Sequence, residues 1–101
     1  MSDRELLEAA AKAAGIEFGW IHDTPRIRAE MGWTPWNPLT DDGDALRLAV
    51  KLELQLDLRH SFHTVRVYGA AEGRIDETGD PYAATRRAIV RAAAELGRIM
   101  K

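Results

Sequence analysis

The chain has 101 residues, a length typical of one domain and sufficient for a hydrophobic core without a disulfide or a structural metal. Fourteen basic and sixteen acidic residues leave a net charge of −2, which argues against a strongly cationic nucleic-acid binder and against an acidic DNA mimic. The absence of cysteine excludes disulfides, a thiolate nucleophile and a cysteine zinc site. These features predict one globular domain over residues 1–101.

The N-terminal residues do not have the pattern of a secretion signal. They include Ser2, Asp3, Arg4 and Glu5 rather than a basic stretch followed by an apolar one, and nowhere do about 18 apolar residues run together. We therefore expect a soluble, unexported protein without a membrane partner. The lack of cysteine fits a reducing compartment, so the expected location is the cytoplasm.

The first element along the chain is a predicted helix. Ser2 and Glu5 stand at capping-box spacing, and Gly15 can close a helix in the left-handed conformation. This predicts a helix over residues 3–14. A change to alternating apolar residues from position 16 to position 20 then predicts a strand with one buried face.

The next stretch leads to a second helix. Residues 22–32 have a mixed pattern, and residues 31–36 are expected to form a short partner strand that Pro35 interrupts. Thr40 or one of the aspartates after it can cap a helix, predicted over residues 41–52. The apolar stripe of this helix consists of Ala45, Leu46, Ala49 and Val50, and it can extend to Leu52.

Two alternating runs follow the second helix. Leucines alternate with polar residues over 52–58, and valines alternate with polar residues over 64–68, so the runs predict an antiparallel hairpin with its turn at 59–63. Residues 69–79 are rich in glycine and charge, and we expect them to form a connection.

The last helix is predicted from Asp80-Pro81 to the C-terminus, with the aspartate as cap and the proline in the first turn. Its apolar side consists of Tyr82, Ile89, Ala92, Ala93, Leu96, Ile99 and Met100. Taken together, the elements predict an α+β fold in which a small antiparallel sheet of about three to four strands packs with three α-helices.

The opposite side of the last helix carries Arg87, Arg91 and Arg98 within about 40° of one another. Because the guanidinium group matches the geometry of phosphate, these three arginines are candidate nucleic-acid-binding residues. A solvated helix face explains them as well, since the net charge is −2 and Glu95 shares that side.

Trp20, Trp33 and Trp36 are candidate protein-binding residues. Tryptophan both fills cores and anchors interfaces. If helices cover only one side of the sheet, some of these rings emerge on its open face and form an apolar patch that a partner or a second copy would cover. Core packing and an interface are both open at this point.

Few residue clusters suggest chemistry. Asp41, Asp42 and Asp44 could ligate Ca²⁺ or Mg²⁺, but the residues that follow do not complete a calcium loop, so capping of a helix is favoured. His60 and His63 lie at the predicted turn without the spacing of a zinc site. The sequence therefore predicts no catalytic residue, no metal site and no cofactor.

An asparagine-proline pair, a run of aspartates and a short amphipathic helix precede the predicted hairpin, and a proline opens an alanine-rich final helix. The segments are Trp36-Asn37-Pro38, residues 40–49 (TDDGDALRLA) and residues 80–92 (DPYAATRRAIVRA). This order resembles that of small uncharacterised phage and prophage proteins of the phage α-β-α sandwich family. The resemblance covers about residues 33–100 and rests on caps and core positions, so it implies origin and fold but no active site.

These observations leave two main functional hypotheses. The first is a non-enzymatic phage or prophage accessory protein that binds a protein partner or forms a homodimer in the bacterial cytoplasm. The alternative is a nucleic-acid-associated protein of phage replication or recombination, whose binding through the arginines of the last helix would weaken as salt rises. A small enzyme would instead need two of His60, His63, Asp57 and Asp41 to converge on one pocket.

Overall fold

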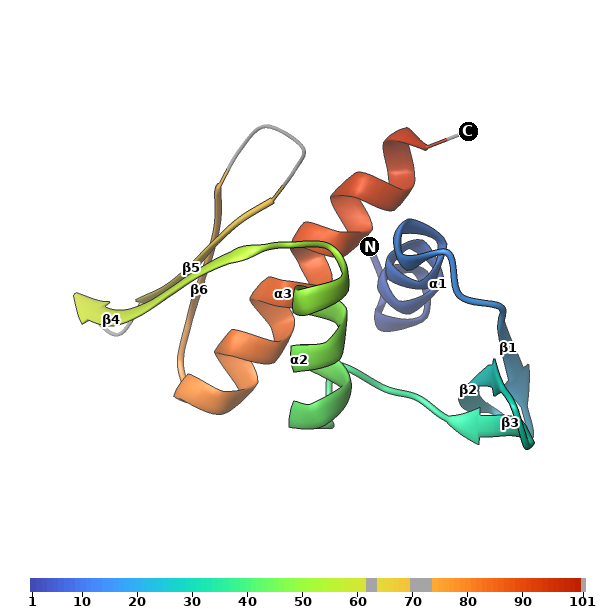
Figure 1. Cartoon of the computed structure of the whole chain (residues 1–101). Coiled ribbons are helices and arrows are strands. Elements are labelled where there is room, and N and C mark those ends of the chain that lie inside the picture. Colours follow the sequence, from blue (N-terminus) through green and yellow to red (C-terminus); the bar gives the residue numbers. More distant parts are fainter. Residues whose placement is uncertain (62–63, 70–73, 101) are drawn as a thin grey trace.

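The computed structural model describes residues 1–61, 64–69 and 74–100, which form three helices and six strands (Figure 1). The helices are α1 (Asp3–Ala14), α2 (Asp42–Lys51) and α3 (Pro81–Ile99). The strands are β1 (Phe18–Ile21), β2 (Thr24–Ala29), β3 (Gly32–Pro35), β4 (Gln55–Ser61), β5 (Thr64–Tyr68) and β6 (Arg74–Thr78). No helix in the described ranges is both long and apolar enough to span a bilayer.

The predicted bounds of the first helix are confirmed. The Ser2 hydroxyl accepts a hydrogen bond from the N–H of Glu5 at 3.2 Å, and the Glu5 carboxylate accepts one from the N–H of Ser2 at 3.0 Å. Gly15 ends the helix with φ 69°, a left-handed conformation in which a side chain would be strained. Local hydrogen bonding therefore sets both ends of α1.

α2 begins one residue later than predicted and buries a narrower stripe. Asp41 is its cap and accepts from the N–H of Asp44 at 2.8 Å, as the aspartate run indicated. Leu46 and Val50, which we expected in the core, are 57% and 68% exposed. The expectation was wrong because α2 packs mainly on α3, and one packing partner covers only part of an apolar stripe.

α3 is the central element of the fold. It contacts α1, α2, β5 and β6, and its buried residues include Ala88, Ile89 and Ala93. Tyr82 and Ile99, expected on the core side, are 69% and 66% exposed, and Met100 is also exposed. Nineteen residues span about 28 Å, so the two ends of α3 extend past the elements that cover its middle (Figure 1).

The first three strands form an antiparallel sheet, which we call sheet A, in the order β1-β2-β3. The strand expected near residues 16–20 is β1, and the short partner strand is β3; between them, the mixed stretch forms β2. Phe18 and Ile27 are paired across the first two strands and both pack against the hydrophobic core. One face of sheet A is therefore directed inward, beside α1.

The other strands form sheet B, in the order β4-β5-β6. The predicted hairpin is confirmed by the antiparallel pairing of Leu56 with Val67, although β4 starts later than the leucine run. The expected connection over 69–79 was wrong in part, because β6 pairs with β5 along residues 74–78. Its alternation was hidden because the inward positions of β6 are Ile75 and a charged residue, Glu77.

The α+β class and the three helices are confirmed, with the strands divided between two sheets of three. α3 lies between sheet B on one side and α1 on the other, and sheet A lies beyond α1 (Figure 1). The hydrophobic core includes residues of both neighbours of α3 that are almost fully buried, namely Val65 and Val67 of sheet B and Ala10 and Ala11 of α1. Helices thus cover one face of sheet B, and its other face is polar.

Candidate functional site

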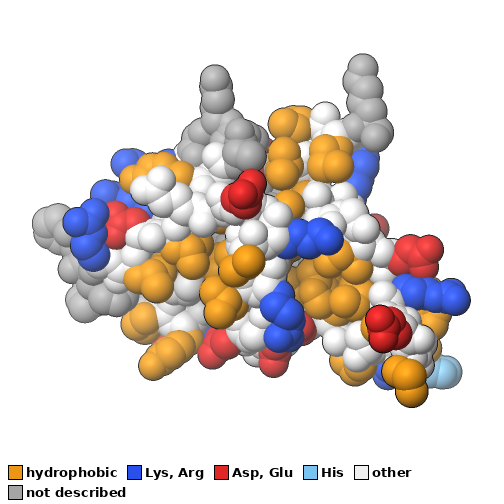
Figure 2. All heavy atoms as spheres, viewed as in Figure 1, with side chains coloured by type: hydrophobic (Ala, Val, Ile, Leu, Met, Phe, Trp, Pro, Cys, Tyr) orange, Lys and Arg blue, Asp and Glu red, His pale blue; other side chains and the backbone are white. Residues whose placement is uncertain are grey.

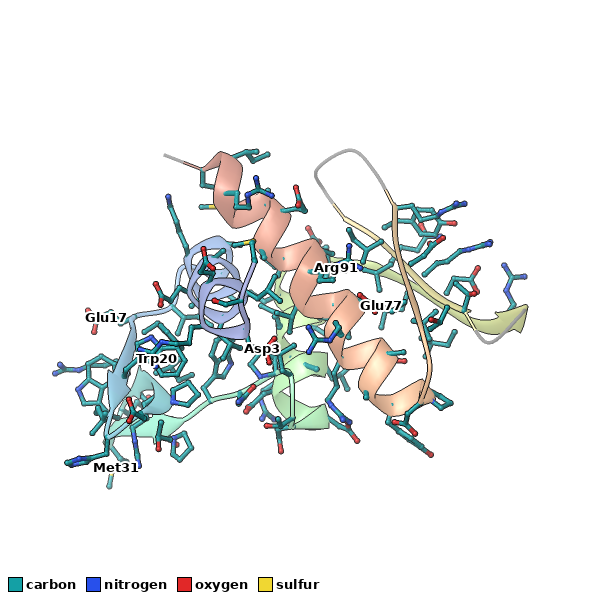
Figure 3. The ribbon with its side chains drawn as sticks, turned by 180° about the vertical axis from the view of Figure 1, so that it is seen from behind. Asp3, Glu17, Trp20, Met31, Glu77 and Arg91 are labelled. Atoms are coloured by element: carbon teal, nitrogen blue, oxygen red, sulfur yellow. The ribbon has the colours of Figure 1, made fainter. Side chains whose placement is uncertain are left out.

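Two of the three tryptophans are structural. Trp36 is 4% exposed and packs edge-on against Phe18, with ring centroids 5.7 Å apart. Trp20 packs against α1 (Figure 3). The guanidinium of Arg4 is 4.0 Å from the centroid of the Trp20 ring, and the indole N–H of Trp20 donates to Glu8 at 3.3 Å. The Trp20 contacts join sheet A to α1, and the Trp36 ring is buried against sheet A, so both rings have a structural role.

Trp33 differs from the other two because it is 40% exposed on the outward face of sheet A. An ideal Cβ at Gly19 would lie 3.6 Å from two atoms of the indole ring, so the ring rests over that glycine. The Arg28 guanidinium is 6.0 Å from the ring centroid. Of the three predicted protein-binding residues, Trp33 is the one that the fold places at the surface.

The three candidate nucleic-acid-binding arginines of α3 all have carboxylate partners. Arg87 reaches α1 and Arg98 pairs within α3. Arg91 reaches Glu77 on β6 (Figure 3). The partners are Asp3, Glu77 and Glu95, at 3.4 Å for Arg87 and 3.0 Å for Arg98. Arg87 and Arg91 therefore link α3 to its neighbours, and the positive charge of all three arginines is largely balanced locally.

The three clustered aspartates have three separate structural tasks. Asp41 caps α2, Asp42 forms an ion pair with α3, and Asp44 ties the preceding loop to the helix. The Asp41 carboxylate accepts from the N–H of Asp44, and the Asp42 carboxylate lies 2.6 Å from the Arg86 guanidinium. The Asp44 carboxylate accepts from the N–H of Asn37 at 3.0 Å and from Arg47 at 2.8 Å. Within the described residues, no group of three acidic or histidine side chains could hold a metal ion.

The histidines do not form a described site. His22 lies in the turn between β1 and β2, and the backbone of His60 belongs to β4, whereas His63 is outside the described residues. Asp57, also on β4, accepts hydrogen bonds from Arg59, which hold the pKa of that carboxyl below its usual range. This carboxylate is thus part of an exposed ion pair on the polar face of sheet B.

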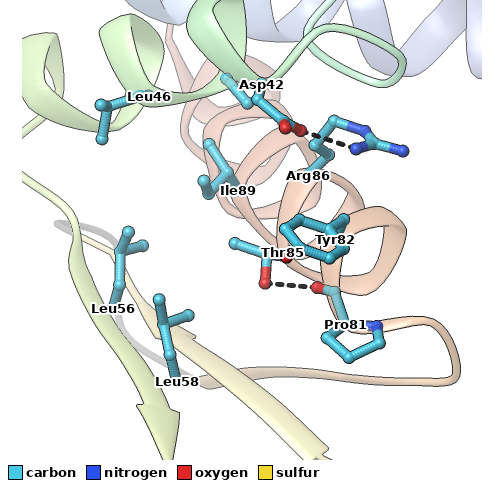
Figure 4. Close-up of a pocket in the computed structure, with 10 residues that line it drawn as sticks. Asp42, Leu46, Leu56, Leu58, Pro81, Tyr82, Thr85, Arg86 and Ile89 are labelled. Carbon is cyan, nitrogen blue, oxygen red and sulfur yellow. Dashed lines mark hydrogen bonds and ion pairs between the residues drawn. The ribbon is translucent and has the colours of Figure 1, made fainter.

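Apolar side chains from α2, β4 and α3 line an open groove of about 470 Å³ (Figure 4). Its floor contains the buried residues Ala45 and Ile89. Its rim contains Leu46, Leu58 and Tyr82, all substantially exposed. Figure 2 shows hydrophobic side chains gathered over β4, the outer side of α2 and the start of α3. The groove is thus surrounded by apolar surface.

Asp42, Thr85 and Arg86 are polar residues of the groove wall whose side chains already have partners. Asp42 and Arg86 form an ion pair, and the Arg86 Nε–H also donates to the carbonyl of Leu39 at 2.9 Å. The Thr85 hydroxyl donates to the carbonyl of Pro81 at 2.6 Å (Figure 4). With these groups already satisfied, the arrangement is suited to binding apolar groups rather than to activating a nucleophile.

The groove was not predicted from the sequence, because Leu46 and Tyr82 were expected in the core. A signal was present: α2 carries apolar residues over a wider arc than one packing partner can cover. β4 adds Leu56 and Leu58, which alternation places on the helix-facing side of sheet B.

Comparison of the chain with protein-family models, with curated proteins and with solved structures finds no match in any of the three. The similarity to the phage α-β-α sandwich family stays a prediction from the motifs.

Proposed function

We propose that the chain is a non-enzymatic phage or prophage accessory protein that acts by protein–protein binding in the bacterial cytoplasm, and that the groove joins two copies into a homodimer. The observation that carries the proposal is the hollow between α2, β4 and α3 with exposed apolar side chains on its rim. Contiguous exposed apolar surface of this kind is typical of interaction sites. The proposed phage origin rests on the resemblance of the motifs at residues 36–49 and 80–92, and the proposed location on the lack of cysteine.

A second copy is the occupant that the shape of the patch favours. A twofold interface is formed by the same patch on both subunits, so the patch must supply both the hollow and the side chains that enter it. Here Leu46 and Tyr82 project beside the hollow whose floor is Ile89. Around a twofold axis, the projecting residues of each copy can enter the hollow of the other.

Analytical ultracentrifugation over a concentration series tests the proposal. We expect a dimer at about 100 µM and a monomer for Leu58→Glu, which puts a charge into the rim. Burying one leucine contributes about 1.5–3 kcal/mol, and a twofold interface contains it twice, so the dissociation constant should rise by about 100-fold or more. A wild-type chain that stays monomeric up to about 1 mM would overturn the proposal.

The matched control is Met31→Glu. Met31 is fully exposed in the turn between β2 and β3, at the far end of sheet A, so it offers the same change of an exposed apolar residue to a charge (Figure 3). We expect Met31→Glu to remain a dimer. Equal loss of dimer in both variants would point to a general effect of added charge and would count against the groove.

The alternative, nucleic-acid binding through Arg87, Arg91 and Arg98, has less support. A phosphate would have to compete with the carboxylates that these side chains already contact.

A further inference from the structure

The arginines of the described residues fall into two groups. Nine of the eleven have a carboxylate oxygen within 4.0 Å; they are Arg4, Arg47, Arg59, Arg66, Arg74, Arg86, Arg87, Arg91 and Arg98. Arg26 and Arg28, both on β2, have none among the described residues. The buried Nε of Arg26 also has no hydrogen-bond partner there. Among the arginines of the described ranges, the two on β2 are therefore the ones without a carboxylate partner.

Strand register places both arginines beside the exposed tryptophan. Arg28 is paired with Trp33 across β2 and β3, and Arg26, two residues earlier, is on the same face. Gly19 pairs with Arg26 from the other side, and the Trp33 ring rests over it. The opposite face of sheet A packs against the core. The outward face thus combines one aromatic ring with two guanidinium groups.

This combination matches the chemistry of a single-stranded nucleic acid. An unpaired base can stack on an exposed indole, and a guanidinium group can donate two parallel hydrogen bonds to a phosphate. Same-face residues in a strand are about 6.7 Å apart, so Arg26 and Arg28 can contact neighbouring phosphates of one extended strand. A duplex keeps its bases stacked on one another, so Trp33 would have no base to accept.

The geometry points to the outward face of sheet A as a binding surface for single-stranded nucleic acid, with a base stacked on Trp33 and phosphates held by Arg26 and Arg28. This surface belongs to β1, β2 and β3, whereas the groove is lined by α2, β4 and α3, so the two sites share no residue (Figure 1).

One carboxylate acts against binding. Glu17 lies opposite Arg28, and the backbone N–H of Arg28 donates to the Glu17 carbonyl at 3.0 Å. The strand register directs the exposed side chain of Glu17 to the same face as Arg28. With a net charge of −2, the chain as a whole does not attract a polyanion, so affinity comes from the local contacts. Replacing Glu17 by glutamine therefore tightens binding, an effect that a purely structural role of this face would not produce.

Fluorescence anisotropy with a labelled oligodeoxythymidylate of about ten nucleotides tests the surface at several salt concentrations. Two phosphate contacts give a slope of log K against log salt of about −1.4, and Arg28→Gln reduces the slope to about −0.7. Trp33→Leu weakens binding by about 5- to 150-fold without changing the slope, and Trp33→Phe restores part of the loss. Far-UV circular dichroism verifies that each variant is folded.

The matched control is Arg98→Gln, which removes an exposed arginine from α3 and leaves sheet A intact. Unchanged binding by this variant supports the assignment. Three results overturn it: no salt-dependent binding by the wild-type chain, equal weakening by Arg98→Gln and Arg28→Gln, or better competition by an acidic peptide than by the unlabelled oligonucleotide. The last result would assign the face to a protein partner instead.

Discussion

α3 packs so closely on α1 at one glycine that a substitution there should destabilise the fold. At Gly97 on α3, an added Cβ would lie 1.9 Å from the carbonyl oxygen of Ala9 on α1 and 2.8 Å from its carbonyl carbon. Ordinary contacts begin near 3.4 Å, so Gly97→Ala requires the two helices to separate by roughly 1.5 Å. The obstructing atoms are backbone atoms, which cannot rotate away as a side chain would.

The expected cost follows from two opposing effects. Overpacking a close contact costs typically 1–3 kcal/mol and more where the backbone must shift, whereas glycine to alanine inside a helix gains about 1 kcal/mol. Separation also loosens the almost fully buried contacts of Ala10 and Ala93. We therefore expect Gly97→Ala to lower the free energy of unfolding by about 2 kcal/mol or more.

Urea unfolding at one fixed protein concentration measures the effect. With a slope of about 1–2 kcal/mol per molar urea, the midpoint should fall by about 1–2 M. Gly43→Ala on α2 is the matched control, because its added Cβ would meet only side-chain ends, those of Arg47 at 3.2 Å and Asp41 at 3.3 Å. We expect that variant to change stability by less than about 1 kcal/mol. A Gly97→Ala protein as stable as the wild type would refute the close crossing of α1 and α3.

Two further predictions concern carboxylates. Asp44→Ala should lower the free energy of unfolding, measured by thermal denaturation, by about 1–3 kcal/mol, because it leaves the part-buried backbone N–H of Asn37 without its acceptor. The carboxylate of Asp42 is exposed, so an equal loss of stability in Asp42→Ala would contradict this explanation. The Arg59 hydrogen bonds lower the pKa of Asp57 in the folded state, so the stabilisation they provide is complete at neutral pH and is lost as pH falls through the folded-state pKa. The difference in the free energy of unfolding between wild type and Arg59→Gln should therefore shrink as the pH falls from about 5 to about 2. A difference that stays constant over this range would show that Arg59 does not lower the pKa of Asp57 in the folded state.

Helix ends could be predicted from the sequence because they depend on neighbours within four residues. The Ser2–Glu5 capping box, the Gly15 closure and the Asp80-Pro81 start are all present as expected. The hairpin of β4 and β5 was predictable for a similar reason, since strict alternation of leucine and valine with polar residues defines one buried face.

The strand that was missed shows where local patterns fail. β6 has Glu77 at an inward position, which breaks the apolar alternation that marks a strand. That glutamate is acceptable there because Arg91, fourteen residues later on α3, pairs with it. The same contact changes the meaning of Arg91 from a free cation to part of an ion pair, and neither fact is visible before the two elements are placed together.

The sequence by itself determined the class of the fold, the three helices and the residue types available for binding, because local propensity, capping and periodicity act within a few residues. Only the tertiary structure decided which apolar and charged side chains remain available. Leu46 is exposed because a single helix covers α2, and Trp36 is buried because sheet A folds back beside α1. Burial and charge balance depend on neighbours that are distant in the chain, so a periodic pattern can identify a face without showing what lies against it.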